Sequence, residues 1–164
     1  MTRQLTRKKE PAGGFTLIEI LVVVVILGVL AAIVLPQFVG VTGDVERATF
    51  VADVRIFANC ARRYMLDTGG YLEDSDSGVC PAGFEPYMQE AKWEEITPIG
   101  GVWDAELDSF GIKSAFGVHF NGEGETRDDA YMLLIDDAFD DNDLATGAFR
   151  KIADGRYYFI LEDI

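Results

Sequence analysis

The sequence feature that most constrains this chain is an apolar run of 21 residues, Phe15–Leu35, in which Glu19 is the one ionisable side chain. As a helix rising 1.5 Å per residue, such a run spans about 30 Å, the thickness of the hydrocarbon core of a bilayer. A carboxylate at membrane depth costs about 2.5–3.5 kcal/mol even on lenient insertion scales. The sequence therefore predicts a membrane-spanning helix in which Glu19 has a partner of opposite charge.

The charges on either side of the run predict its orientation. Four basic residues and one acidic residue precede it, whereas the first charged residues after it are Asp44 and Glu46. Because positive charges are retained in the cytoplasm, the amino end is expected inside and the body exported. A secretory signal peptide is the alternative, but its apolar core is shorter and its small-residue cleavage site follows the core. Here the small pair, Gly13 and Gly14, precedes the core.

The segment "GGFTLIEILVVVVILGVLAAIVLP" resembles the amino-terminal segment of type IV pilins and type II secretion pseudopilins, and the resemblance covers about residues 8–57. It implies that a prepilin peptidase cuts between Gly14 and Phe15 and methylates the new amino terminus of Phe15. Glu19 then occupies the position of the family's glutamate. Gly28 and Pro36 fall where pilins often carry residues that loosen the helix.

Cleavage would create the partner that Glu19 requires. The new amine of Phe15 is cationic, and pairing it with a carboxylate lowers the cost of burying both groups. A pair formed between neighbouring subunits would set their axial register. For Gly28 and Pro36 two interpretations stay open, namely local unwinding of the helix between them and a simple kink at the membrane surface.

These observations predict three parts of the chain. Residues 1–14 are a cytoplasmic leader that is removed, and residues 15–36 are the transmembrane half of a long helix that becomes the filament core. Residues 37–164 are an exported globular head that includes the second half of the helix. This head is long enough for one modest hydrophobic core.

Within the head, the pattern predicts an α+β, pilin-like fold in which the long helix packs on a small antiparallel sheet of three or four strands. An apolar stripe with 4-3-4-3 spacing runs along residues 42–68 and comprises Phe50, Val54, Phe57, Ala61 and Tyr64. Strands are expected in 99–104, 110–120 and 155–163. Residues 131–135 fit a short amphipathic helix or a buried strand equally well, and Trp93 marks a possible helical turn.

The charge balance limits the partners of the head. The chain carries a net charge of −14, and residues 15–164 hold 27 acidic against ten basic groups. A body this acidic repels nucleic acid and anionic lipid, so no nucleic acid partner is expected. Solubility, divalent cations and basic partners remain as interpretations of the charge.

Two further sets of residues are candidate sites. Cys60 lies on the predicted helix and Cys80 in the following loop, and in an oxidising compartment we expect them to form a disulfide. An acidic run follows in the second half of the head and provides the candidate calcium ligands Asp136, Asp140, Asp141 and Asp143. Its spacing is not that of an EF-hand, and a solvated turn explains it as well. No other cofactor is expected.

The sequence contains no recognisable catalytic constellation. His119 is the one histidine, and strand alternation places it on the outer side of the sheet, without a nucleophile near it in the sequence. We therefore expect a structural protein and no enzyme.

The predicted function is that of a filament subunit of the type II secretion pseudopilin kind. The stretches "TPIGGVWDAE" and "NDLATGAFR", similar to parts of secretion-system pilin-like proteins, favour this interpretation. A type IV pilus pilin and a membrane-tethered binding module are the alternatives. The expected partners are identical or homologous subunits, the prepilin peptidase and an inner-membrane assembly platform. The expected location is the inner membrane, with a periplasmic head, and then a periplasmic or cell-surface filament.

Overall fold

The computed structural model describes residues 14–164, so most of the predicted leader, residues 1–13, lies outside the described residues. Residues 42–164 form one compact unit, and the chain before them forms another. The elements are α1 (Leu17–Thr68), α2 (Glu90–Glu94), β1 (Val102–Ser109), β2 (Ile112–His119), α3 (Asp129–Asp136), β3 (Phe149–Ala153) and β4 (Arg156–Asp163).

Helix α1 contains the apolar run from Leu17 onward. Its segment Leu17–Val34 has a mean hydropathy of 3.2, and none of it is buried by the protein. A helix of this length and composition can cross a membrane. The backbone is helical at both Gly28 and Pro36, so the loosening expected between these residues stays a prediction.

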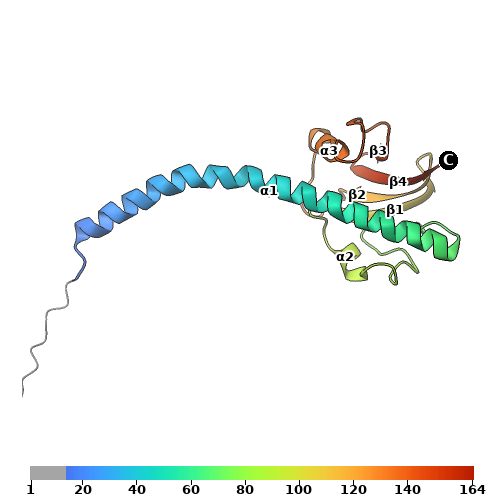
Figure 1. The fold of residues 1–164 in the computed structure, drawn as a ribbon, viewed down its shortest axis with the longest axis horizontal. Coiled ribbons are helices and arrows are strands. Elements are labelled where there is room, and N and C mark those ends of the chain that lie inside the picture. The colour runs from blue at the N-terminus through green and yellow to red at the C-terminus, as the bar shows by residue number, and fades with distance from the viewer. Residues whose placement is uncertain (1–13) are drawn as a thin grey trace, which may run out of the picture. The chain divides into compact units, whose positions relative to one another are not determined.

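The head consists of the carboxyl half of α1 packed on a four-stranded sheet. The strand order is β1-β2-β4-β3, and each neighbouring pair is antiparallel. Figure 1 shows the carboxyl half of α1 running along the sheet, with α3 and β3 on one side of the helix and α2 on the other. The predicted α+β, pilin-like fold is therefore confirmed.

The structure also settles the segments that the sequence left open. Residues 129–136 form helix α3 and no strand, and Asp128 caps this helix by accepting a hydrogen bond from the Tyr131 N–H. Strand β1 begins later and ends later than the predicted strand in 99–104. Strand β3 was not predicted at all, and it completes the sheet by pairing with β4.

An aromatic cluster holds the helix to the sheet. The ring of Trp103 in β1 stacks on Phe50 of α1 at 5.2 Å between centroids, and it meets Phe57 edge-on at 4.7 Å. Phe57 also stacks on Trp93 of α2 at 5.7 Å. All four side chains are almost completely buried. Phe57 is the central contact of the core, because it joins α1 to both Trp93 and Trp103. Aromatic pairs in this geometry add to the stability gained from burial.

Replacing Phe57 with alanine is expected to destabilise the head by about 3–5 kcal/mol, because the substitution leaves a cavity between Trp93 and Trp103. The measurement is denaturant unfolding of the detergent-solubilised chain, followed by tryptophan fluorescence. Leu66→Ala is the matched control on the same helix, since the Leu66 side chain is 86% exposed and its truncation should change stability by less than about 0.5 kcal/mol. Equal losses for the two variants would contradict the central role of Phe57.

Candidate functional site

The amino end of α1 is closed by a reciprocal contact between Thr16 and Glu19. The Thr16 backbone N–H and the Thr16 hydroxyl both donate to Oε2 of Glu19, each at 2.7 Å. The Glu19 N–H donates in turn to Oγ1 of Thr16 at 3.3 Å. This is a capping box, in which a threonine and a glutamate three residues later satisfy free N–H groups at the start of a helix.

The capping box adds a functional residue that the sequence analysis missed. The signal was present as the spacing Thr-x-x-Glu at the start of the apolar run. Both contacts from Thr16 end on Oε2, and among residues 14–164 no hydrogen bond reaches Oε1. One carboxylate oxygen of Glu19 therefore fixes the start of its own helix, and the other accepts no hydrogen bond from the described part of the chain.

The acidic run forms a cluster around the carboxyl end of α3. Asp136, Asp140 and Asp141 each place a carboxylate oxygen within 4.8 Å of the others. Asp136 is completely buried, and neither of its carboxylate oxygens has a hydrogen-bond partner among the described residues. A buried carboxylate without a partner is costly, so this group needs either a proton or a cation.

The loop that follows α3 holds the other two carboxylates in place. Asp140 accepts hydrogen bonds from the N–H groups of Asp141, at 2.9 Å, and Ala148. Asp141 accepts a hydrogen bond from the Thr146 hydroxyl at 2.8 Å. Gly147 has a φ of 79°, and a Cβ there would lie 2.1 Å from the Asp140 carboxylate. Only glycine therefore allows the loop to close around Asp140.

The cluster fits calcium in the chemistry of its donors. Calcium takes oxygen ligands, and carboxylates are preferred among them. Asp143, the fourth ligand predicted from sequence, does not belong to the cluster that the structure forms. Its side chain instead accepts a hydrogen bond from the Ala145 N–H at 3.0 Å, as expected for an aspartate in a turn.

Burial and the negative charge of Asp140 together control the protonation of Asp136. They raise the pKa of Asp136 from its ordinary 3.8 to about 7. Burial also acts to raise the pKa of Asp140, but the hydrogen bonds that this carboxylate accepts, first from Ala148, bring its pKa below the ordinary value.

The two cysteines are free thiols, so the structure does not contain the predicted Cys60–Cys80 disulfide. Cys60 is half-buried on α1 and Cys80 is buried in the loop, where burial raises the pKa of its thiol to about 11. The loop is held to α1 by aromatic packing instead. Tyr64 meets Phe84 and Tyr87 edge-on, at 6.0 and 5.4 Å between ring centroids.

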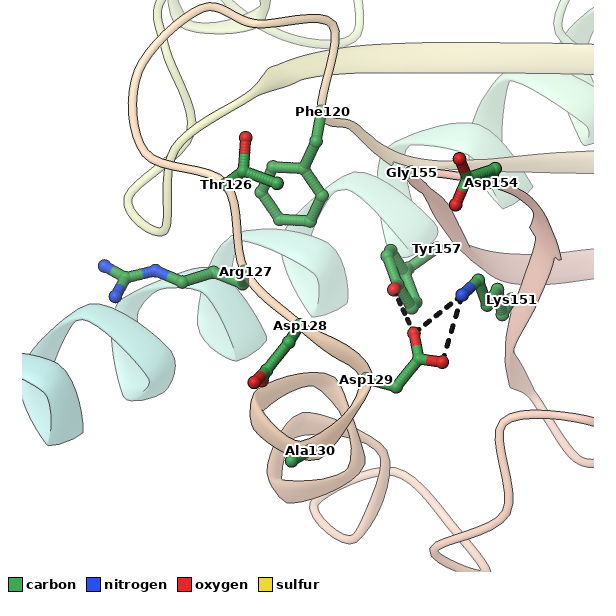
Figure 2. A pocket seen from close by; sticks show the side chains of 10 residues that line it. All are labelled: Phe120, Thr126, Arg127, Asp128, Asp129, Ala130, Lys151, Asp154, Gly155 and Tyr157. Atoms are coloured by element: carbon green, nitrogen blue, oxygen red, sulfur yellow. Dashed lines mark hydrogen bonds and ion pairs between the residues drawn. The ribbon is translucent and has the colours of Figure 1, made fainter.

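A cavity of about 610 Å³ opens beside the start of α3. Figure 2 shows Asp129 binding both Lys151 and Tyr157 at its edge, with the ring of Phe120 on the other side. The Lys151 ammonium lies 2.8 Å from the Asp129 carboxylate, and the Tyr157 hydroxyl donates to the same group. The hydrogen bond from Lys151, followed by that from Tyr157, lowers the pKa of Asp129, so this carboxylate is charged and already paired.

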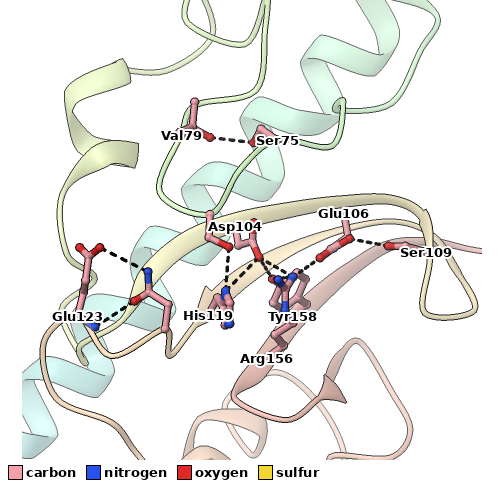
Figure 3. Close-up of polar contacts among 11 residues, drawn as sticks. Ser75, Val79, Asp104, Glu106, Ser109, His119, Glu123, Arg156 and Tyr158 are labelled. Carbon is pink, nitrogen blue, oxygen red and sulfur yellow. Dashed lines mark hydrogen bonds and ion pairs between the residues drawn. The ribbon is translucent and has the colours of Figure 1, made fainter.

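A second polar cluster lies on the outer face of the sheet (Figure 3). Asp104 and Glu106 are buried there and share the guanidinium of Arg156, which lies 2.7 Å from Asp104. The Tyr158 hydroxyl also donates to Asp104. His119 lies 3.7 Å from Asp104 and contacts the Ser77 hydroxyl at 2.8 Å, so it is on the outer side, as predicted. These groups bind one another and fasten the loop before α2 to the sheet.

A capped apolar helix that carries one glutamate and continues into an α+β head has the arrangement of the pilin-like class of proteins. The comparisons with known proteins agree with this class. Residues 11–35 match the family model described as "Prokaryotic N-terminal methylation motif". The resemblance inferred from the amino-terminal residues is thereby confirmed.

The chain is also similar to relatives that carry the name "Type II secretion system core protein G". The chain is 38% identical to "Type II secretion system core protein G" of Aeromonas hydrophila over 64 residues, which is 39% of this chain and 45% of the relative. It is 41% identical over 64 residues to that of Pseudomonas aeruginosa, with the same coverage. It is 43% identical over 76 residues, 46% of the chain and 48% of the relative, to that of Pectobacterium carotovorum. The chain thus spans less than half the length of these relatives.

Asp136 should make the stability of the cation-free protein depend on pH. The folded state holds a proton up to a pH of about 7, whereas the unfolded chain releases it near 3.8. Stability should therefore fall as the pH rises between these values. The measurement is thermal unfolding in EDTA at pH 5 and at pH 7.5. Between these values the free energy of unfolding of the wild type should fall by on the order of 2 kcal/mol more than that of Asp136→Asn, which has no proton to release. Parallel pH profiles for the two proteins would contradict the raised pKa.

Proposed function

We propose that this chain is a structural subunit of a pilin-like filament in a type II secretion system and a substrate of a prepilin peptidase. The observation that carries the proposal is the match of residues 11–35 to the methylation motif, together with the likeness to core protein G. The cut falls between Gly14 and Phe15, and Phe15 becomes the methylated first residue. The role is structural and not enzymatic.

The location of the subunit follows from α1. The apolar segment Leu17–Val34 anchors the chain once in the inner membrane, with the amino end in the cytoplasm and the head in the periplasm. An assembly platform in that membrane then moves the subunit into a filament. Its direct partners there are identical or homologous subunits. The loss of lipid around the apolar helix is offset by packing against neighbouring helices.

Glu19 has two roles in this proposal, one for each carboxylate oxygen. Oε2 is held by Thr16 of its own chain at 2.7 Å. Oε1 receives the cationic amine of Phe15 from a neighbouring subunit. Because an unpaired charge in a dry helix bundle is costly, this ion pair selects one axial step between subunits.

The alternatives of a type IV pilus pilin and a membrane-tethered binding module have less support. The relatives are all named for type II secretion. A tether would use the apolar helix as an anchor and would not form filaments. Recovery of filaments from cells therefore separates the tether from both filament proteins.

We further propose that the head binds one calcium ion at Asp136, Asp140 and Asp141. The supporting observation is the buried carboxylate of Asp136, whose two oxygens have no partner among the described residues. A bound cation would supply the positive charge that burial of this group requires. The ion would stabilise the loop between α3 and β3 and would take no part in a reaction.

Processing is tested by the mass of the mature protein. The intact mass from membranes of cells with an active prepilin peptidase should correspond to a chain that begins at Phe15 and carries one added methyl group. Gly14→Trp should leave the precursor uncut, because the peptidase requires a small residue there. A mature chain that begins elsewhere would contradict the proposed site.

The two roles of Glu19 can be separated with two substitutions. Glu19→Gln keeps a capping-box residue but removes the charge, whereas Thr16→Val removes the cap and keeps the charge. If the ion pair sets the register, Glu19→Gln should be inserted and cut normally but should lower the yield of sheared filaments by about tenfold or more, the effect of losing a few kcal/mol. Thr16→Val should have the smaller effect, since a lost cap costs about 1 kcal/mol. Wild-type filament yield from Glu19→Gln would show that the charge is dispensable.

Calcium binding is tested by thermal unfolding at pH 7.5. Adding calcium chloride to roughly 1 mM, enough to fill a site of micromolar to sub-millimolar affinity, should raise the melting temperature of the protein after EDTA has been removed. The reason is that a ligand that binds the folded state stabilises it. Asp136→Asn should lose this response, and Asp143→Asn should retain it as the matched control. Equal responses from all three proteins would place the ion elsewhere or exclude the site.

A further inference from the structure

The ten basic side chains of residues 42–164 differ in how closely they are bound within the head. Eight are bound to a carboxylate or, for Arg55, to the Ala138 carbonyl oxygen. These eight are Arg47, Arg55, Lys92, Lys113, Arg127, Arg150, Lys151 and Arg156. The other two are neighbours on α1. Arg62 reaches only Asn59, at 3.5 Å, and Arg63 only Asp67, at 3.8 Å.

Arg63 is an exposed and loosely paired cation of the described head. Its side chain is 78% exposed, and Arg62 beside it is also exposed. Residues 42–164 carry 26 acidic groups against these ten basic ones. Two adjacent arginines without a close ion pair on so acidic a body are complementary to an anionic surface, and another copy of the same head offers one.

The cavity beside α3 has the chemistry that an arginine requires. An arginine stem packs on apolar or aromatic surface while its guanidinium binds carboxylates. The cavity offers the ring of Phe120 together with Asp128 and Asp154. Asp129 is already occupied by Lys151 and Tyr157. Asp128 uses one oxygen to cap α3, and Asp154 makes no hydrogen bond or ion pair within residues 14–164.

The arginines and the cavity lie far apart on the same head. Arg127, which lines the cavity, is bound to Glu46 of α1 at 2.8 Å. Arg63 is 17 residues further along that helix, which corresponds to about 25 Å. The two features therefore cannot meet within one chain. A contact between them joins two different surfaces, and such a heterologous contact continues into an open helical assembly when its rotation does not close a ring.

We propose that Arg63 of one copy inserts between Phe120 and Asp154 in the cavity of a second copy, with Arg62 at the rim close to Asp128. The proposal rests on the filament role proposed above and specifies which surfaces of neighbouring heads meet. It gives Arg62 a carboxylate partner, gives Arg63 a closer one than Asp67, which lies 3.8 Å away in its own chain, and gives Asp154 a cation.

Charge reversal on the full-length chain in cells tests the contact. Arg63→Glu and Asp154→Arg should each be inserted and processed normally, and each should lower the yield of sheared filaments by about tenfold, because like charges then meet in the cavity. The two substitutions combined in one chain should restore the yield. Co-expression of the two single variants as differently tagged chains should also restore it, since each then meets its opposite charge on the other chain.

The matched control is Arg63→Glu combined with Glu73→Arg. Glu73 is exposed and lies outside the cavity, so the second substitution restores the net charge of the head but not the contact in the cavity. The double variant should therefore form as few filaments as Arg63→Glu alone. Wild-type yield from both single variants, or no recovery when they are combined, would overturn the contact while leaving the filament role intact. A wild-type chain that forms no filaments would overturn the filament role and the contact with it.

Discussion

The packing of α1 against Trp103 is the interaction on which the rest of the head depends. Phe50 and Phe57 lie two turns apart on the helix, and both contact the same indole. This fixes the rotation of α1 about its axis, because turning the helix would expose the aromatic rings to water. Once the rotation is fixed, Glu46 reaches Arg127 near one end of the head and Tyr64 reaches the loop that contains Phe84 at the other. The positions of both candidate contact surfaces follow from this one arrangement.

Local periodicity predicted the helix and most of the sheet. The stripe that includes Phe50 and Phe57 repeats with the helical period, and the strands around Phe116 and Tyr158 are rich in β-forming residues. Strand β3 was not visible, because it is only five residues long and contains the adjacent cations Arg150 and Lys151. It becomes a strand because β4 offers it an edge, which is a property of the fold and not of the segment.

Some features of the candidate sites are likewise visible in the local sequence, and others depend on the fold. Glu19 stands out in the sequence because no other ionisable group lies in the apolar run. The cap from Thr16 is also encoded in the sequence, as a threonine three residues before a glutamate at the start of the apolar run. The burial of Asp136 could not be read from sequence, since Asp137 beside it is exposed and only the packing of α3 distinguishes them. Both cysteines are free thiols in the structure, and an oxidising compartment permits a disulfide only where the two side chains also meet the geometry of the bond.

The capping box has a consequence for the charge that processing would create. The first turn of a helix already carries a partial positive charge from its aligned peptide dipoles. After cleavage before Phe15, the new ammonium group would lie close to the amino end of α1. Its positive charge and the partial positive charge of the helix end would repel each other. Glu19 is the anion nearest to both. By holding Oε2 at the helix end, Thr16 keeps the carboxylate of Glu19 close to both the helix dipole and the amine, so that one negative charge stabilises both positive ones. Without the cap, the first turn of the helix would fray and the carboxylate would no longer be held beside the amine.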